Sequence, residues 1–283
     1  MRKQINLKSY LDQVWNVIDS NRLEANTPIL QSNNPEEVKA SLNTSFPTQP
    51  QPFQDLLQDF EKEVLPFLNY NTSPNFGAYI TGSGNPIGPF AEFIKAFYNQ
   101  NGLKWNNSPI SSELEQLVIQ WIAEYCLLPY HSQGVLTSGG SMSNLLAIHF
   151  ALADRYPDRE MAGLQEAPKF TIYCSNQTHS SVDRAMVFLG LGRNHLRKIG
   201  VNAQFQLDIN ELKSTIEKDV AEGFTPFMII GKATIRIVRS VSNTFEAILA
   251  LVLHTIPDFR KFSSLCSHEI VALSTHFSNH LTA

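Results

Sequence analysis

The chain has 283 residues, of which 43% are apolar and 17% are charged. That balance excludes a disordered polymer, because a chain with this apolar share and length can bury a large core. With 22 basic and 26 acidic residues the formal net charge is −4, so no overall basic field exists to attract a phosphate backbone or an acidic lipid surface. We therefore expect neither nucleic acid nor a membrane as a partner.

The cysteines and the first residues indicate the compartment. Cys126, Cys174 and Cys266 lie far apart in apolar or strand-like runs, which is typical of reduced thiols and lacks metal-ligand spacing. The start of the chain is basic, but polar residues interrupt every apolar run, so it does not predict a signal peptide. We expect a cytoplasmic protein.

Residues 1–110 are predicted to form a helical arm and a loop segment. Apolar residues at helical spacing predict helices over about 7–18, 54–65 and 90–99. The last two are separated by residues 69–89, which contain four Gly and three Pro. A loop of that length often carries function.

Residues 111–231 are predicted to form an α/β domain. A helix over about 111–127 is expected to begin at a Ser111 or Ser112 cap, and its apolar stripe consists of Leu114, Leu117, Val118, Trp121, Ile122 and Tyr125. Short strands at 134–137, 170–174, 195–201 and 226–230 then alternate with helices at 142–156, 180–189 and 208–222. Asp208 is the expected cap of the last helix, with Glu211 at the capping-box position. This alternation predicts a mostly parallel sheet with ligands at the carboxyl ends of its strands.

The first chemical motif follows the predicted strand 134–137 and reads Thr137-Ser-Gly-Gly-Ser-Met-Ser-Asn144. A strand that turns through two glycines into a helix presents free backbone N–H groups and a positive dipole end, which suits a phosphate. The motif lacks both the Walker and the dinucleotide patterns. The alternative is a plain glycine turn in which Ser141 caps the helix.

The second motif, Tyr173-Cys-Ser-Asn-Gln-Thr-His179-Ser-Ser-Val-Asp-Arg-Ala185, lies at the next strand end. The ring of His179 would share a crevice with the glycine turn, where it could stack on a planar cofactor. The alternative is that His179 or Ser180 only caps the following helix.

Together these motifs resemble the group II pyridoxal-phosphate-dependent amino-acid decarboxylases, and the block NFGAYITGSGNPIGPFAEFIKAFYNQNGLKWNN resembles their substrate loop and dimer-forming helices. The resemblance covers about residues 53–230. It implies the aspartate-aminotransferase-like fold (PLP fold type I), present here as an incomplete large domain with an N-terminal helical segment. It also implies a homodimer, an amino-acid substrate and pyridoxal 5'-phosphate as cofactor.

The resemblance also implies roles for individual residues. Gly139, Gly140 and Ser141 match the positions that bind the cofactor phosphate, and His179 matches the catalytic histidine stacked on the cofactor ring. The region that shapes the substrate pocket in the family corresponds to Phe76, Tyr79 and Pro109. Met142 departs from the acidic residue common at its position.

The composition changes after Gly231. Residues 232–283 contain no glycine, although all 14 glycines precede them. In the family the ring-nitrogen carboxylate lies in a His-x-Asp-x-Ala block, which this sequence lacks. The family's imine lysine follows a histidine, but none of the eight histidines here precedes a lysine. We expect residues 232–283 to be an atypical segment, out of frame or degraded, on a truncated decarboxylase. His268, His276 and His280 fit a solvated tail better than a metal site.

Three functional hypotheses follow. The first is a carboxy-lyase that converts an amino acid into an amine and CO2, with this chain inactive by itself. The second is a non-catalytic fragment that only binds or dimerises. The third is a different enzyme of PLP fold type I, since a fold does not fix a reaction.

Overall fold

The computed structural model describes residues 6–22, 27–29, 34–42, 45–73, 75–76, 85–125, 133–235 and 245–252. The chain divides into two compact units, Met1–Tyr98 and Asn99–Ala283, and each is described by itself. None of the described helices is both long enough and apolar enough to cross a membrane.

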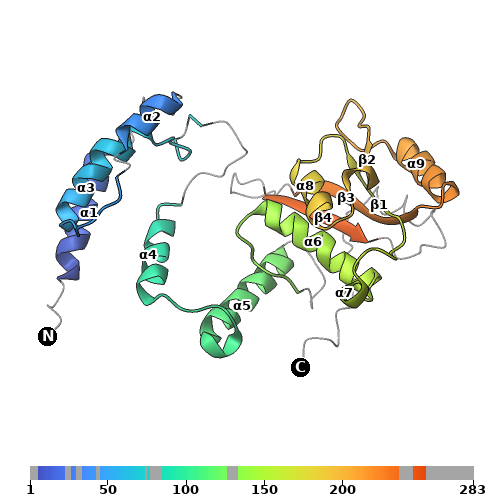
Figure 1. The fold of residues 1–283 in the computed structure, drawn as a ribbon, viewed down its shortest axis with the longest axis horizontal. Coiled ribbons are helices and arrows are strands. Elements are labelled where there is room, and N and C mark those ends of the chain that lie inside the picture. Colours follow the sequence, from blue (N-terminus) through green and yellow to red (C-terminus); the bar gives the residue numbers. More distant parts are fainter. Residues whose placement is uncertain are drawn as a thin grey trace. The chain divides into compact units, whose positions relative to one another are not determined.

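The first unit is helical and contains the three predicted helices and one that the sequence did not indicate (Figure 1). Asn6 caps the first of them by accepting a hydrogen bond from the Ser9 N–H group. The helix that begins at Phe53 continues through a π turn at Phe60–Val64 and ends in a 3-10 turn at Leu65–Phe67, where Pro66 stops the helix. The helices are α1 (Leu7–Ser20), α2 (Pro35–Ser41), α3 (Phe53–Asp59) and α4 (Gly88–Tyr98).

Helix α5 (Pro109–Tyr125) opens the second unit and corrects the predicted cap. The helix begins at Pro109, so Ser111 and Ser112 lie inside its first turn, and the Ser112 N–H group donates to the carbonyl of Ser108. Most of the predicted apolar stripe is exposed, whereas Ile119 and Ala123 are buried. The exposed members are Leu114, Leu117, Trp121, Ile122 and Tyr125.

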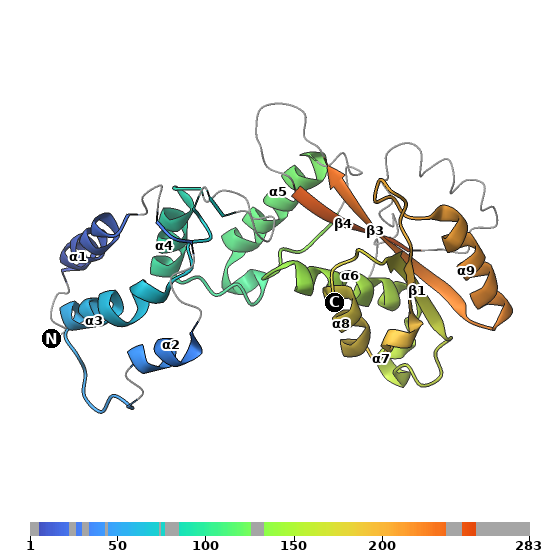
Figure 2. The same cartoon turned by 90° about the horizontal axis from the view of Figure 1, so that it is seen from above.

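The second unit is built on a four-stranded sheet with the order β2-β1-β3-β4 (Figures 1 and 2). The central strand β1 pairs in parallel with both β2 and β3, as predicted, and β4 pairs antiparallel with β3 at the edge. The strands are β1 (Phe170–Ser175), β2 (Leu196–Ile199), β3 (Thr225–Ile235) and β4 (Phe245–Val252).

Two sequence predictions about strands are corrected. Residues 134–137 are not a strand, because no described strand pairs with them, and the Leu136 N–H group donates to the Glu115 side chain instead. The antiparallel strand β4 lies within residues 232–283, which the sequence predicted only as an atypical segment. Strand β3 also continues across Gly231 to Ile235.

Helices cover both faces of the sheet. Helices α6 (Gly140–Arg155) and α8 (Ser181–Phe188) pack on one face, and α9 (Ile209–Ala221) packs on the other. The short α7 (Arg159–Ala162) follows α6. The successive side chains of β1 alternate between the faces, since Ile172 and Cys174 belong to the first core and Tyr173 to the second.

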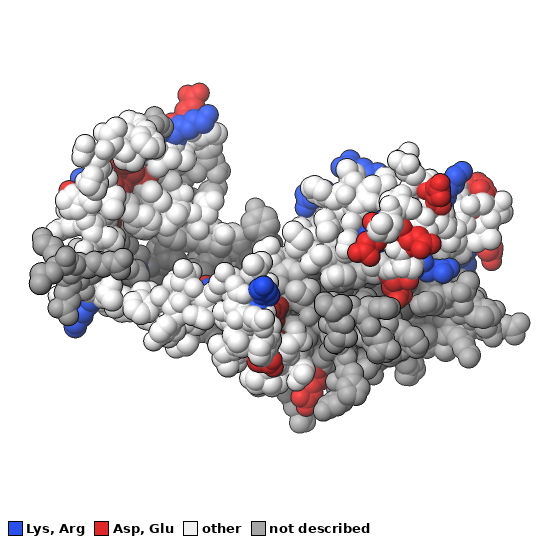
Figure 3. Space-filling model, turned by 60° about the horizontal axis from the view of Figure 1, so that its bottom comes forward, with Lys and Arg blue, Asp and Glu red and all other residues white. Residues whose placement is uncertain are grey.

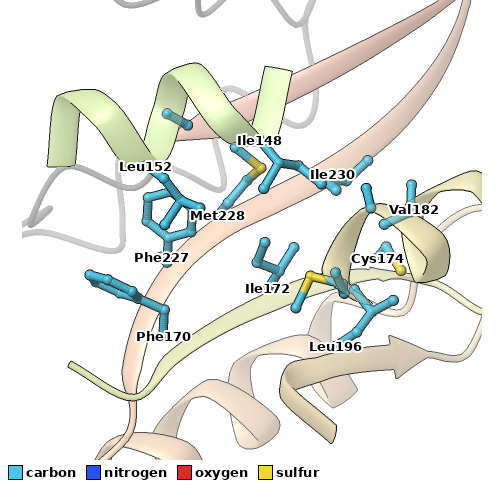
Figure 4. Close-up of a cluster of buried hydrophobic side chains, with 13 residues drawn as sticks. Ile148, Leu152, Phe170, Ile172, Cys174, Val182, Leu196, Phe227, Met228 and Ile230 are labelled. Carbon is cyan, nitrogen blue, oxygen red and sulfur yellow. The ribbon is translucent and has the colours of Figure 1, made fainter. Parts of the chain in front are cut away.

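The larger core lies between the sheet and helices α6 and α8 (Figure 4). Ile148 and Leu152 of α6 meet Phe227 and Met228 of β3, and all four are almost completely buried. This packing holds α6 and α8 side by side, which fixes where the two chemical motifs begin.

The predicted cap of α9 at Asp208 is confirmed, but the capping-box role expected for Glu211 is wrong. Asp208 Oδ1 accepts hydrogen bonds from the N–H groups of Asn210 and Glu211 at 2.9 and 3.0 Å. Glu211 does not return a bond to Asp208, as a capping box requires, but accepts the Gly200 N–H group at 2.9 Å.

A buried polar network braces the amino-terminal edge of the sheet. Arg197 of β2 donates through Nε and Nη2 to both oxygens of Asp219, at 2.6 to 3.0 Å, and the Tyr173 hydroxyl donates to Asp219 Oδ2 at 2.8 Å. The Arg197 guanidinium also lies 4.9 Å from the centre of the Phe224 ring. Burial alone would raise the pKa of Asp219, but the hydrogen bonds from Arg197 and Tyr173 outweigh it and hold that pKa below its ordinary value.

We predict that this brace makes the second unit sensitive to acid. Because the pKa of Asp219 is lower in the folded than in the unfolded chain, its stabilising contribution is complete above about pH 3.9 and is lost as the pH falls through the folded-state pKa. Asp219→Asn should lower the free energy of unfolding by about 3–5 kcal/mol at neutral pH and flatten this acid dependence. Urea unfolding followed by circular dichroism over a pH series measures both.

The control is Asp183→Asn, which removes the partner of Lys198 in an ion pair of 2.9 Å whose side chains are about a third exposed. It should cost less than about 1 kcal/mol. Equal losses in the two variants would contradict a special role for Asp219.

Candidate active site

The glycine turn of the first motif forms the start of α6. Gly139 is the N-cap residue, and its carbonyl accepts the N–H groups of Met142 and Ser143 at 3.0 and 3.1 Å. The Thr137 hydroxyl lies 2.6 Å from the Ser143 hydroxyl and 3.1 Å from the Gly139 carbonyl, so it ties the turn to the helix. Ser141 is inside the first turn and does not cap α6, which removes the plain-cap alternative for this residue.

The same turn has free donors and free space. Within the described part of the chain, the backbone N–H groups of Gly140 and Ser141 contact no acceptor, as expected for the first residues of a helix. A Cβ atom built on Gly139 or Gly140 would meet nothing within 4 Å. The backbone is therefore open to an anion the size of a phosphate, and the positive end of α6 favours one.

The second motif places His179 between β1 and α8. The ring nitrogen Nδ1 accepts the Ser181 N–H group at 3.2 Å and lies 2.9 Å from the Ser181 hydroxyl. The N-cap residue of α8 is Ser180, and its side chain makes no capping bond, whereas the His179 ring, one residue earlier, accepts the first free N–H group of the helix through one nitrogen. Its side chain is otherwise exposed, so the ring face and Nε2 remain available to a ligand.

A hydrogen bond joins the two motifs. Asn144, in the second turn of α6, donates through Nδ2 to the Ser181 hydroxyl at 2.8 Å, and Ser181 contacts His179. Asn144 and Ser181 are 5% and 2% exposed, so both polar groups are satisfied inside the protein. The glycine turn and the imidazole consequently belong to one corner of the sheet, at the carboxyl end of β1.

The other predicted site residues are distributed differently. Phe76 is half-buried and belongs to the first unit, whose position relative to the sheet is not determined, and Tyr79 lies outside the described residues. Pro109 is exposed at the start of α5. The roles of these three residues in a substrate pocket stay predictions.

Asn144 and Ser181 are parts of the site that were not among the residues predicted from the sequence. Both stood inside the quoted motifs, but residue type by itself does not separate a buried polar side chain from an exposed one. An indication was available, since Asn144 shares the helix face of the buried Ile148 and Leu152, four and eight residues on.

The thiol beside the site is buried, and the described residues contain no group of metal ligands. Cys174, at the end of β1, is fully buried, and burial raises the pKa of its thiol, so it stays protonated. Among the described residues, no three His, Cys, Asp or Glu side chains form a group that could bind a metal ion. His268, His276, His280, Cys126 and Cys266 lie outside those residues.

Comparison with known families agrees with the motifs. The model of the pyridoxal-dependent decarboxylase conserved domain matches residues 35–248, a span that starts earlier than the resemblance seen in the sequence and continues past Gly231. L-tyrosine/L-DOPA decarboxylase 2 of Lophophora williamsii is 31% identical over 210 residues, and tyrosine decarboxylase 2 of Arabidopsis thaliana is 29% identical over 209. Each alignment covers 71% of this chain but only 40% and 38% of the relatives' own lengths.

Solved structures show the same fold. The crystal structure of mouse CSAD superposes with a TM-score of 0.74 at 22% identity and covers 80% of this chain and 48% of that one. Rhodiola rosea 4-hydroxyphenylacetaldehyde synthase gives a TM-score of 0.70 at 25% identity, with 80% and 50% covered. The chain therefore has the fold expected from the sequence and spans about half of these enzymes.

Proposed function

This chain belongs to the pyridoxal-dependent decarboxylase family, and we propose that it forms the cofactor-binding front part of an enzyme that converts an amino acid into an amine and CO2. The observation that carries the proposal is the bond between Asn144 and Ser181, because it brings the glycine turn and His179 to one corner. The names of the relatives make tyrosine and DOPA the first substrates to test.

The residues of this corner fit pyridoxal 5'-phosphate. The free N–H groups of Gly140 and Ser141 would bind the phosphate, and the Ser141 hydroxyl, which has no partner among the described residues, would add a donor. The exposed ring of His179 would lie against the flat face of the cofactor. When bound, the cofactor supplies an electron sink for the pair of electrons that CO2 leaves behind.

We predict that Gly140→Ala weakens cofactor binding without unfolding the protein. A methyl group fits the structure at this position and suits a helix, but it would stand between the phosphate and the backbone donors. The dissociation constant for pyridoxal 5'-phosphate, from absorbance titration of the full chain, should rise about tenfold.

The matched control is Gly88→Ala at the start of α4, where an added Cβ also meets nothing within 4 Å. It should leave cofactor affinity unchanged, and thermal melting of both variants checks folding. Equal affinities of Gly140→Ala and the unchanged chain would contradict a phosphate site at this turn.

We also propose that these 283 residues do not complete the reaction by themselves. In the family the cofactor is bound covalently by a lysine that follows a histidine, and no such pair occurs in this sequence. Incubated with cofactor, the full chain should release no CO2 from tyrosine, DOPA, tryptophan, glutamate or diaminobutyrate, and borohydride should fix no cofactor to it. Covalently fixed cofactor found by mass spectrometry would refute this.

The exposed apolar face of α5 supports a homodimer as the working form. Leu114, Leu117, Trp121 and Tyr125 are each 39–58% exposed and follow one side of the helix, whereas soluble monomers seldom leave such a continuous apolar stripe uncovered. Charged residues of both signs are scattered over the face drawn in Figure 3. The stripe itself is apolar, so burial of apolar surface would have to supply most of the association energy. The occupant that we propose for this stripe is a second copy of the chain.

We predict that the full chain sediments as a concentration-dependent dimer and that Trp121→Glu shifts it to the monomer, because a buried carboxylate without a partner is costly. Gln120→Glu adds the same charge next to the stripe, at an exposed position outside it, and should leave the dimer intact. A monomer at every concentration in the unchanged chain would contradict the dimer.

A further inference from the structure

The protons in the buried link between the two motifs can be assigned from its donors and acceptors. The Ser181 N–H group can only donate, and its acceptor is Nδ1 of His179 at 3.2 Å. A nitrogen that accepts in this way carries no proton. The proton of the neutral imidazole must then be on Nε2.

The Ser181 hydroxyl is also oriented as a donor to His179 Nδ1. Its oxygen accepts from Asn144 Nδ2 at 2.8 Å, and the amide nitrogen of asparagine can only donate. The hydroxyl proton is then free to point to His179 Nδ1, 2.9 Å away. Because Asn144 and Ser181 are buried, water does not compete for these bonds, and two donors converge on the one nitrogen.

We propose that Asn144 and Ser181 are positioning residues that hold His179 in the Nε2–H tautomer and fix the plane of its ring. The ring then offers the ligand a flat face and one proton donor at Nε2, while Nδ1 is occupied and cannot act as a base. The identity of that ligand rests on the proposed function, but the tautomer does not.

The tautomer can be read directly from the full chain without cofactor. Long-range ¹H–¹⁵N spectra of protein labelled at histidine separate protonated from unprotonated ring nitrogens, and the His179→Gln variant identifies the signal of His179. At a mildly alkaline pH, where imidazole side chains are neutral, Nδ1 should appear unprotonated and Nε2 protonated. A protonated Nδ1, or an even mixture, overturns the proposal.

Asn144→Asp tests whether residue 144 must donate the hydrogen bond to the Ser181 hydroxyl, and it hardly changes the shape of the side chain. A carboxylate can only accept, so the Ser181 hydroxyl would turn toward it and offer its oxygen to the ring, which shifts the Nδ1 signal toward the protonated position. Asn210→Asp, an exposed change in the first turn of α9, adds the same charge and should leave the His179 spectrum unchanged. An unshifted spectrum in a folded Asn144→Asp variant overturns the role of Asn144.

Ser181→Ala supplies a second variant in case the buried carboxylate prevents folding. It removes the hydroxyl and keeps the backbone donor, so the preference for the Nε2–H tautomer should weaken but not reverse. An unchanged preference would assign the tautomer to the backbone alone and overturn the role of the hydroxyl. Cofactor titration of the same samples is read separately, so a chain that fails to bind pyridoxal 5'-phosphate refutes the proposed function and leaves the tautomer result standing.

Discussion

The hydrogen bond from Asn144 to the Ser181 hydroxyl is the contact on which the proposed site depends, because it joins two helices that begin at different chemical motifs. The apolar core between α6, α8 and the sheet brings the helices together, but hydrophobic packing tolerates small rotations. A buried polar pair does not, since a rotation would leave both groups unsatisfied. The core therefore sets the distance between the motifs and the polar pair sets their angle.

The sheet has a different kind of chemistry at each edge. At the carboxyl end of β1 the residues near the site are exposed donors and an imidazole, which are free to meet a ligand. At the amino end, Arg197, Asp219 and Tyr173 are joined to one another and leave no group for a substrate. This division fits the general behaviour of parallel sheets, in which ligands bind at the carboxyl ends of the strands.

The sequence predicted the parallel strands β1 to β3, their helices and the two motifs, because apolar periodicity and glycine turns depend only on residues that are close in sequence. It did not predict that 134–137 would pair with none of the described strands, or that β4 would pair antiparallel with β3, because strand pairing depends on residues far apart in the chain. The burial of Asn144 was indicated only by its place on the helix face of Ile148 and Leu152. Tyr79 lies outside the described residues, so its predicted role is untouched.

The contacts of Arg197 with Asp219 and Phe224 require a planar side-chain group at position 197. One flat guanidinium donates to both oxygens of the Asp219 carboxylate while its central carbon lies 4.9 Å from the centre of the Phe224 ring. A lysine would bring the same charge as a single rounded ammonium group, which cannot do both. Replacement by the other basic residue is therefore not a conservative change at this position, even though it would leave the net charge of the chain untouched.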